Sequence, residues 1–160
     1  MIDLKENFSI IDVIDADLIN LELKARNKNE VISELSQMLL EKEILKNKED
    51  FIKDVFLREE EGMTGLGKGV AIPHGKSESV KKTSIVIGRV AKPIDWESLD
   101  DEPVNIIILF AVRNIDETTT HIKLLQKVAI LLADEDFISQ LQTVKTKEEM
   151  LTLLSKNPEG

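Results

Sequence analysis

The stretch "VNIIILFAV", residues 104–112, is the longest strongly apolar run in the chain. A helix that crosses a bilayer needs about 20 apolar residues, so this run is too short to span a membrane. A short apolar run without polar alternation is typical of a strand that is buried on both of its faces. We therefore predict a central strand here, in a sheet with helices on both sides.

The residues on either side of this run carry the spacings of short strands and amphipathic helices. Branched and apolar residues predict strands at residues 18–23, 70–73 and 84–90. Apolar positions three and four residues apart predict one helix capped by Asn29, one from Lys48 to Glu61, one after the threonines at 118–120, and short helices at 135–142 and 147–155. The predicted fold class is α/β, with a small mixed sheet of about five strands flanked by helices.

The composition excludes several classes of partner. The 160 residues include 30 acidic and 21 basic side chains, and the resulting net charge of −9 disfavours nucleic acid and anionic lipid as partners. No cysteine is present, so disulfides and thiolate metal sites are excluded. The start, "MIDLKENFSI", lacks the basic end and apolar core of a signal peptide. We expect a cytoplasmic protein without membrane insertion, folded as a single domain over residues 1–160 with an ordered core at about 3–156.

The segment "REEEGMTGLGKGVAIPHGK", residues 58–76, resembles the glycine loops that hold nucleotide phosphates, but it lacks features that those loops require. Gly62 and Gly67 have the spacing of a P-loop, yet Gly69 stands where that motif needs Ser or Thr for magnesium. Pro73 would also interrupt the helix that a P-loop must open. The dinucleotide-binding fingerprint fails as well, because no glycine stands three residues after Gly67. A nucleotide site is therefore not predicted.

The same segment presents one of the two histidines of the chain, His74, directly after a proline. A neutral imidazole keeps a nucleophilic lone pair at cellular pH, and a phosphoryl group bound to it can move on to another acceptor. The stiff proline backbone would hold the ring, while the N–H groups of Gly65 and Gly67 would receive phosphate oxygens. Thr64 would add a hydroxyl donor, and Arg58 a planar, permanent positive charge. We predict a histidine that carries phosphate.

The second histidine, His121, is the natural partner of His74 if the fold brings the two together. The macrodipole at a helix N-terminus disfavours the imidazolium, so a neutral His121 would donate a hydrogen bond to the phosphate or to His74. Zinc is not expected, because two distant histidines without cysteine do not form a ligand set. A serine hydrolase is not expected either, because the chain has no Gly-x-Ser-x-Gly segment.

These residues resemble a family, enzyme IIA of the bacterial phosphoenolpyruvate-dependent sugar phosphotransferase system in its fructose and mannitol class. The family signature is an arginine-glutamate pair, a spacer, Ser or Thr near a glycine-hydrophobic-glycine step, another glycine, and Ala-hydrophobic-Pro-His. The matching positions are Arg58, Glu59, Thr64, Gly65, Leu66, Gly67, Gly69, Ala71, Ile72, Pro73 and His74. The stretches "GRVAKPIDW", "DDEPVNIIILFAV" and "THIKLLQKVAILLADEDF" are similar to the family too, so the resemblance covers nearly the whole chain. Lys68 stands at a variable position, commonly asparagine, and no role is assigned to it.

The resemblance implies a route for the phosphoryl group. His74 would accept it from the histidine-containing phosphocarrier protein and pass it to a IIB domain of a sugar permease, usually onto cysteine. His121 would be the second active-site histidine and Arg58 the arginine that faces the phosphate. No metal or soluble cofactor is expected, and a fructose-like sugar is the expectation for the class, since the membrane component sets specificity.

Two other functions are compatible with the same segment. A regulatory member, similar to the nitrogen-related IIA proteins, would use phosphorylation of His74 to control its binding to other proteins. A degenerate binding module would use the fold without chemistry, which the joint presence of Arg58, His74 and His121 disfavours. Transport and regulation both remain open at this point.

Overall fold

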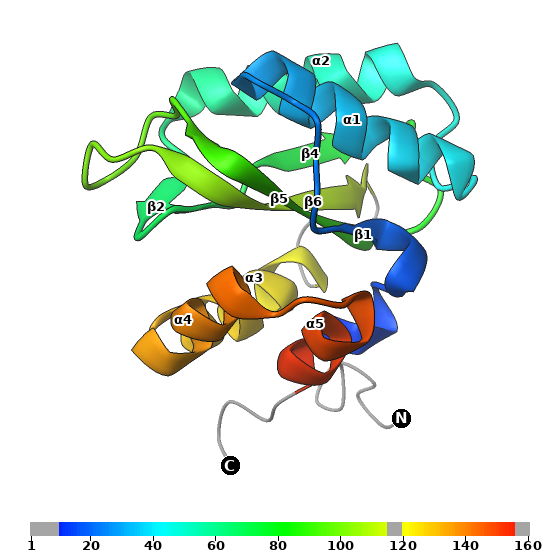
Figure 1. The fold of residues 1–160 in the computed structure, drawn as a ribbon. Helices are drawn as coiled ribbons and strands as arrows, with labels where there is room; N and C mark the ends of the chain where they lie inside the picture. Colours follow the sequence, from blue (N-terminus) through cyan, green and yellow to red (C-terminus); the bar gives the residue numbers. More distant parts are fainter. Residues whose placement is uncertain (1–9, 115–119, 156–160) are drawn as a thin grey trace.

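The computed structural model describes residues 10–114 and 120–155, and the side chains of residues 120 and 121 are not described. A single sheet lies between two layers of helices (Figure 1). The layer on one face consists of α1 (Lys28–Glu41) and α2 (Lys48–Glu61). The layer on the other face consists of α3 (Thr120–Leu132), α4 (Glu135–Thr143) and α5 (Lys147–Leu154). The predicted α/β sandwich with helices on both faces is confirmed.

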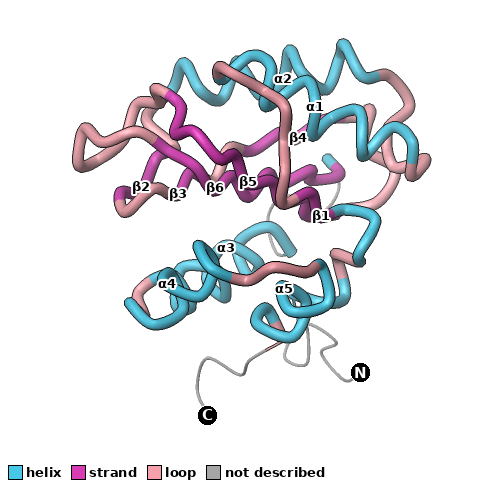
Figure 2. Tube along the Cα trace, viewed as in Figure 1, coloured by secondary structure: helices cyan, strands magenta, loops and turns pink. Residues whose placement is uncertain are grey.

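The sheet is mixed, and within the described residues it contains six strands, one more than predicted. They are β1 (Ile19–Asn20), β2 (Gly65–Gly67), β3 (Val70–Ala71), β4 (His74–Ser77), β5 (Ser84–Ile94) and β6 (Val104–Arg113). Their order is β1-β5-β6-β3-β2, with β4 also paired to β6 (Figure 2). Two of the six strands, β2 and β4, lie outside the ranges placed from the sequence. The glycine segment, residues 62–69, contributes β2, which pairs with β3 in an antiparallel hairpin, and β4 follows Pro73 along β6.

The central strand is β6, as the apolar run predicted. Its residues from Ile106 to Val112 are all buried, because helices cover both faces of the sheet at this position. One edge of β6 pairs antiparallel with β5, and the other pairs parallel with β3 and then β4. Pro73 separates β3 from β4 because proline has no N–H to donate to the ladder. Its carbonyl still accepts a hydrogen bond of 2.9 Å from the Phe110 N–H, so the chain stays attached to β6.

Two predicted boundaries near the N-terminus were wrong. Asn27, not Asn29, caps α1: its backbone is extended and its side chain accepts a hydrogen bond of 2.9 Å from the Glu30 N–H. The predicted strand at 18–23 shrinks to the two residues of β1, since Ala16–Leu18 form a turn of 3-10 helix instead. The other predicted helices are found within one residue of their predicted ends where these are described, but residues 118 and 119 of the threonine run lie outside the described residues.

The described helices include none that is long and apolar enough to cross a membrane.

A left-handed turn connects β2 to β3 and encloses a carboxylate. Gly67, Lys68 and Gly69 all have positive φ, at 97°, 58° and 82°. The Lys68 N–H donates a hydrogen bond of 2.9 Å to Asp100 Oδ2, and the Ser98 hydroxyl and the Glu102 N–H each donate one of 3.0 Å to Oδ1. These bonds, that from Lys68 above all, lower the pKa of the Asp100 carboxyl. The Asp100 side chain therefore links the turn to residues 98–102.

Helix α2 packs so closely on β4 that residue 75 has no room for a side chain. A Cβ built on Gly75 would lie 2.5 Å from Phe51 Cε1 and 2.7 Å from Val55 Cγ2. We expect Gly75→Ala to lower the free energy of unfolding by about 1–3 kcal/mol, because the helix or its side chains must move to admit the methyl group. Urea denaturation measures this change. Gly62→Ala is the matched control: nothing lies within 4 Å of a Cβ there, so equal losses in both variants would contradict the prediction.

The Asp100 carboxylate stabilises the fold in a way that depends on pH. Because its folded pKa is lowered, its contribution is complete above the unfolded value, about 3.9, and is lost as the pH falls through the folded value. We expect Asp100→Ala to unfold at lower urea concentration than wild type at neutral pH, with a difference that shrinks below about pH 4. Glu102→Ala, which retains the N–H that donates to Asp100, is the control. A difference that is constant between pH 7 and pH 3 would contradict the assignment.

Candidate functional site

His74 is the first residue of β4 and lies opposite Phe110 of β6. The two ring centroids are 5.0 Å apart with 36° between the ring planes. The residue keeps only 6% of its surface exposed, and its Nδ1 atom is buried. The hypothesis from the sequence requires a ring nitrogen that a partner can reach, and the buried Nδ1 does not meet this requirement. The aromatic contact and the burial together limit the ring to a narrow range of orientations.

The backbone that leads into His74 is attached on two sides. The Ile72 N–H donates a hydrogen bond of 2.9 Å to the Thr64 carbonyl, which ties the approach to β4 to the glycine segment. The Phe110 N–H donates to the Pro73 carbonyl at 2.9 Å, which ties it to β6. Since proline also fixes its own φ, the position of residue 74 is determined before its side chain makes any contact.

Arg58 lies in the last turn of α2, one turn beyond Val55, the residue that contacts Gly75. Its Nη1 donates to the Gly62 carbonyl at 3.4 Å, a long bond that uses one of the five N–H groups of the guanidinium. The side chain is half-buried. The helix therefore carries a permanent positive charge beside Gly62, the residue at which α2 leads into the glycine segment.

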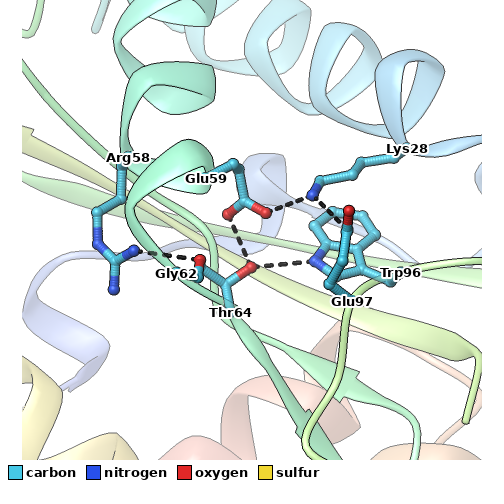
Figure 3. A network of polar contacts seen from close by, with 7 residues as sticks. All are labelled: Lys28, Arg58, Glu59, Gly62, Thr64, Trp96 and Glu97. Carbon is cyan, nitrogen blue, oxygen red and sulfur yellow. Dashed lines mark hydrogen bonds and ion pairs between the residues drawn. The ribbon is translucent and has the colours of Figure 1, made fainter. Parts of the chain in front are cut away.

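Thr64 is placed differently from the sequence-based hypothesis, which made it a donor to phosphate. The side chain is 2% exposed, and its hydroxyl donates to Glu59 Oε2 at 2.7 Å while it accepts from Trp96 Nε1 at 3.0 Å (Figure 3). A hydroxyl has one proton, and here the carboxylate of Glu59 holds it. The structure thus assigns Thr64 to a buried polar network instead of a phosphate cradle.

Gly65 and Gly67 are also occupied by contacts within the protein. The Gly65 N–H donates to the Glu97 carbonyl at 3.1 Å, and a Cβ at this residue would lie 2.6 Å from that same oxygen. Gly67 is packed against the Asp100 carboxylate, whose negative charge would repel a phosphate. The predicted role of these two glycines as phosphate donors is therefore not supported by their geometry. Gly65 has no space for a side chain against Glu97 and Ser98, and Gly67 has a φ of 97°, which favours glycine.

His121 is the second residue of α3, inside the first turn as expected. Its side chain lies outside the described residues, so its relation to His74 stays a prediction. Among the described residues, no group of three His, Asp or Glu side chains is arranged to hold a metal ion.

Sequence reasoning missed the residues that organise the glycine segment. Glu59 appears in the quoted motif beside Arg58, but nothing local indicates that its carboxylate lies only 6% exposed against Lys28, with 2.5 Å between Oε1 and Nζ. Trp96 is the single tryptophan of the chain, and only this rarity could have drawn attention to it in the sequence. Asn105 and Gln142 form a double amide pair, at 2.5 and 2.9 Å, that fastens α4 beside Gly69. These contacts join residues that are far apart along the chain.

Comparison with known proteins relates this arrangement to a family. The family model "Phosphoenolpyruvate-dependent sugar phosphotransferase system, EIIA 2" matches residues 12–157. The chain is 32% identical over 143 residues to the PTS system fructose-like EIIA component of Escherichia coli (strain K12), an alignment that covers 89% of this chain and 95% of that protein. It is 32% identical over 139 residues, 86% of its length, to the 2-O-alpha-mannosyl-D-glycerate-specific EIIABC component of the same organism, and spans only 21% of that longer protein.

Solved structures show the same fold. The nitrogen regulatory protein IIA-Ntr from Neisseria meningitidis superposes with a TM-score of 0.82 at 30% identity, over 89% of this chain and 97% of that one. Enzyme IIAMTL from Escherichia coli, solved in complex with phosphorylated enzyme IIBMTL, superposes with a TM-score of 0.74 at 26% identity, over 88% and 96%. The family model spans nearly all the described residues, and the fold agrees with it, so the chain belongs to the EIIA type 2 phosphoryl carriers of the phosphoenolpyruvate-dependent sugar phosphotransferase system.

Proposed function

We propose that the protein carries a phosphoryl group on His74. The observation that carries the proposal is the place of this ring, at the first residue of β4, on a backbone attached to both β6 and the glycine segment. Family membership supports the reaction type, and the positive charge of Arg58, which lies beside Gly62 at the start of the glycine segment, is of the sign that a phosphoryl group requires. Phosphoryl transfer asks a protein mainly for positioning and charge stabilisation, and these are what the described residues supply.

We assign the chemistry to the other ring nitrogen, Nε2, because Nδ1 is buried. In the proposed step, the lone pair of Nε2 attacks the phosphorus of a phosphohistidine on the donor. A P–N bond forms at His74 as the donor's P–N bond breaks. The donor ring carries a proton on its other nitrogen and therefore leaves as a neutral imidazole, while His74 keeps the proton on Nδ1. Onward transfer is the same exchange with a cysteine thiolate as the acceptor, and it returns His74 to its neutral form. No oxidant or metal is needed for this balance.

Arg58 and His121 are the proposed assistants of this step. A guanidinium presents several N–H groups in one plane, a geometry that suits the oxygens of a phosphoryl group. His121 lies at the positive end of the α3 dipole, where the neutral imidazole is favoured. A neutral His121 would donate one hydrogen bond to the phosphoryl oxygens or to His74. The single domain of residues 1–160 would act in the cytoplasm.

The proposed partners are a histidine-containing phosphocarrier protein as donor and a IIB domain as acceptor. The solved complex of the related IIAMTL with phosphorylated IIBMTL supports a IIB acceptor. The similarity to a fructose-like EIIA component supports a fructose-like sugar as the final acceptor of the group. The sugar would not bind to this domain, because the membrane component would determine which sugar is transported.

A regulatory role is the second candidate function, and it rests on the similarity to IIA-Ntr of Neisseria meningitidis at 30% identity. In that role the phosphoryl group on His74 would control the binding of other proteins. Both roles use phosphorylation of His74, so this residue does not distinguish transport from regulation. Neighbouring genes for IIB and membrane components would favour transport.

We expect His74 to be the single site of phosphorylation when the protein is incubated with phosphoenolpyruvate, enzyme I and the phosphocarrier. Mass spectrometry under mildly basic conditions, where phosphohistidine survives, locates the group. His74→Gln should accept none. An unlabelled wild-type protein, or label that persists in His74→Gln, would refute the proposed function.

The role of His121 is tested in the second half-reaction. We expect His121→Ala to accept the group and to transfer it to a cognate IIB domain about 10- to 100-fold more slowly, because one donor to the moving phosphoryl group is lost. Single-turnover transfer from the isolated phosphoprotein measures this rate. Transfer at the wild-type rate would remove His121 from the mechanism.

A further inference from the structure

We propose that Glu59 and Thr64 are positioning residues, which set the approach to His74 through a buried polar network without touching the phosphoryl group. The network comprises Lys28, Glu59, Thr64, Trp96 and Glu97 (Figure 3). Its relevance to phosphoryl transfer rests on the proposed function of His74. Its effect on the position of His74 is a property of the fold alone.

Glu59 is the centre of the network. Its carboxylate is 6% exposed, and both oxygens are engaged: Oε1 with Lys28 Nζ at 2.5 Å and Oε2 with the Thr64 hydroxyl at 2.7 Å. A buried carboxylate is tolerated only when it is paired and hydrogen-bonded, so these two bonds fix one arrangement of the side chain. The last turn of α2 is thereby attached both to the start of α1 and to the glycine segment.

Trp96 and Glu97 close the network on the other side. The Trp96 indole N–H donates to the Thr64 hydroxyl at 3.0 Å, and Lys28 Nζ lies 4.9 Å from the centre of the indole ring. Glu97 accepts from Lys28 at 3.0 Å, and its pKa is lowered by its own backbone N–H first and by Lys28 second. The hydroxyl of Thr64 therefore has one fixed donor, the Trp96 N–H, and one fixed acceptor, the Glu59 carboxylate.

The same threonine is coupled to His74 through its backbone. The Thr64 carbonyl accepts the Ile72 N–H at 2.9 Å, and Ile72 precedes the Pro73-His74 pair. A shift of Thr64 must move Ile72, and the stiff proline passes that shift to the ring. The network also includes the residue next to Arg58, although Figure 3 shows the Arg58 and Glu59 side chains pointing to different sides of α2. One carboxylate thus influences the placement of both proposed phosphate-handling residues.

The charges of the network argue against direct phosphate binding by these residues. Glu59 and Glu97 carry two negative charges against the single positive charge of Lys28. A phosphoryl dianion brought to Thr64 would meet the Glu59 carboxylate at close range. The network therefore acts through geometry, and its loss should slow transfer through a misplaced ring, not through a missing phosphate contact.

The test compares Thr64→Val with Thr64→Ser in the full chain. Valine keeps the shape but lacks the hydroxyl, whereas serine keeps the hydroxyl and loses a methyl group. We expect Thr64→Val to accept the phosphoryl group from the phosphocarrier about 10- to 100-fold more slowly at saturating donor, with little change in KM, and Thr64→Ser to remain close to wild type. Glu59→Gln should be slowed as well, because the amide N–H₂ cannot pair with the Lys28 ammonium. Glu61→Gln, two residues along and exposed, is its control.

A second readout does not require phosphorylation. The ring C–H signals of His74 in NMR spectra, the Ile72 amide signal and the fluorescence of Trp96, the only tryptophan, report the geometry of the unmodified protein. We expect all three to change in Thr64→Val and to be restored in Thr64→Ser.

The two readouts separate the proposals. If wild type is not phosphorylated, the proposed function fails, and the spectra alone decide whether the network positions His74. If wild type is phosphorylated while a folded Thr64→Val shows wild-type rates and unchanged His74 and Ile72 signals, the positioning role is overturned. If Thr64→Val does not fold, the same rates and signals are compared between Glu59→Gln and Glu61→Gln. Equal results in these two variants would overturn the positioning role.

Discussion

The pairing of β6 on both of its edges is the constraint on which the rest of the structure depends. A strand that is apolar on both faces is stable only when each face is covered, and this requirement places α1 and α2 on one side and α3 to α5 on the other. On its second edge β6 receives β3 and then β4, with Pro73 between them. The register of that edge puts His74 opposite Phe110. The proposed reactive ring is thus held against a strand whose residues from Ile106 to Val112 are all buried.

Burial of the ring is compatible with phosphoryl transfer because only one nitrogen has to meet a partner. The contact with Phe110 and the burial of Nδ1 restrict the orientation of the imidazole, and in the proposed reaction this leaves Nε2 as the nitrogen that meets the donor. A surface histidine would sample many rotamers, and each encounter with a donor would have to wait for the right one. In this protein the His74 side chain loses that conformational entropy when the chain folds, before a donor binds.

The buried polar network is the second organising feature, and it attaches the end of α2 to the segments around it. Removing one partner of a buried ion pair leaves an uncompensated charge and costs about 3–5 kcal/mol of stability. Replacement of either Lys28 or Glu59 alone would therefore destabilise the fold. Their pairing attaches the end of α2 to the start of α1 and leaves Thr64 no freedom at the entry to the glycine segment. The turn at residues 67–69 is fastened separately by Asp100. A segment that reads as a flexible loop is therefore fixed at both of its ends.

Local pattern was sufficient for some features of this protein and not for others. The apolar run at 104–112 determined a central strand covered on both faces, and the spacing from Lys48 to Glu61 determined α2 with both of its ends, because burial and helix capping depend on neighbouring residues. The motif around His74 was also sufficient to indicate the family. The partners of Thr64, Gly65 and Gly67 were decided only by the tertiary structure. An N–H that seems available to a ligand can be taken by a carboxylate or carbonyl from a distant segment, as Asp100 takes that of Lys68 and Glu97 that of Gly65. Residue order does not encode this proximity. The Thr64 hydroxyl is likewise taken by the Glu59 carboxylate, one turn of chain away.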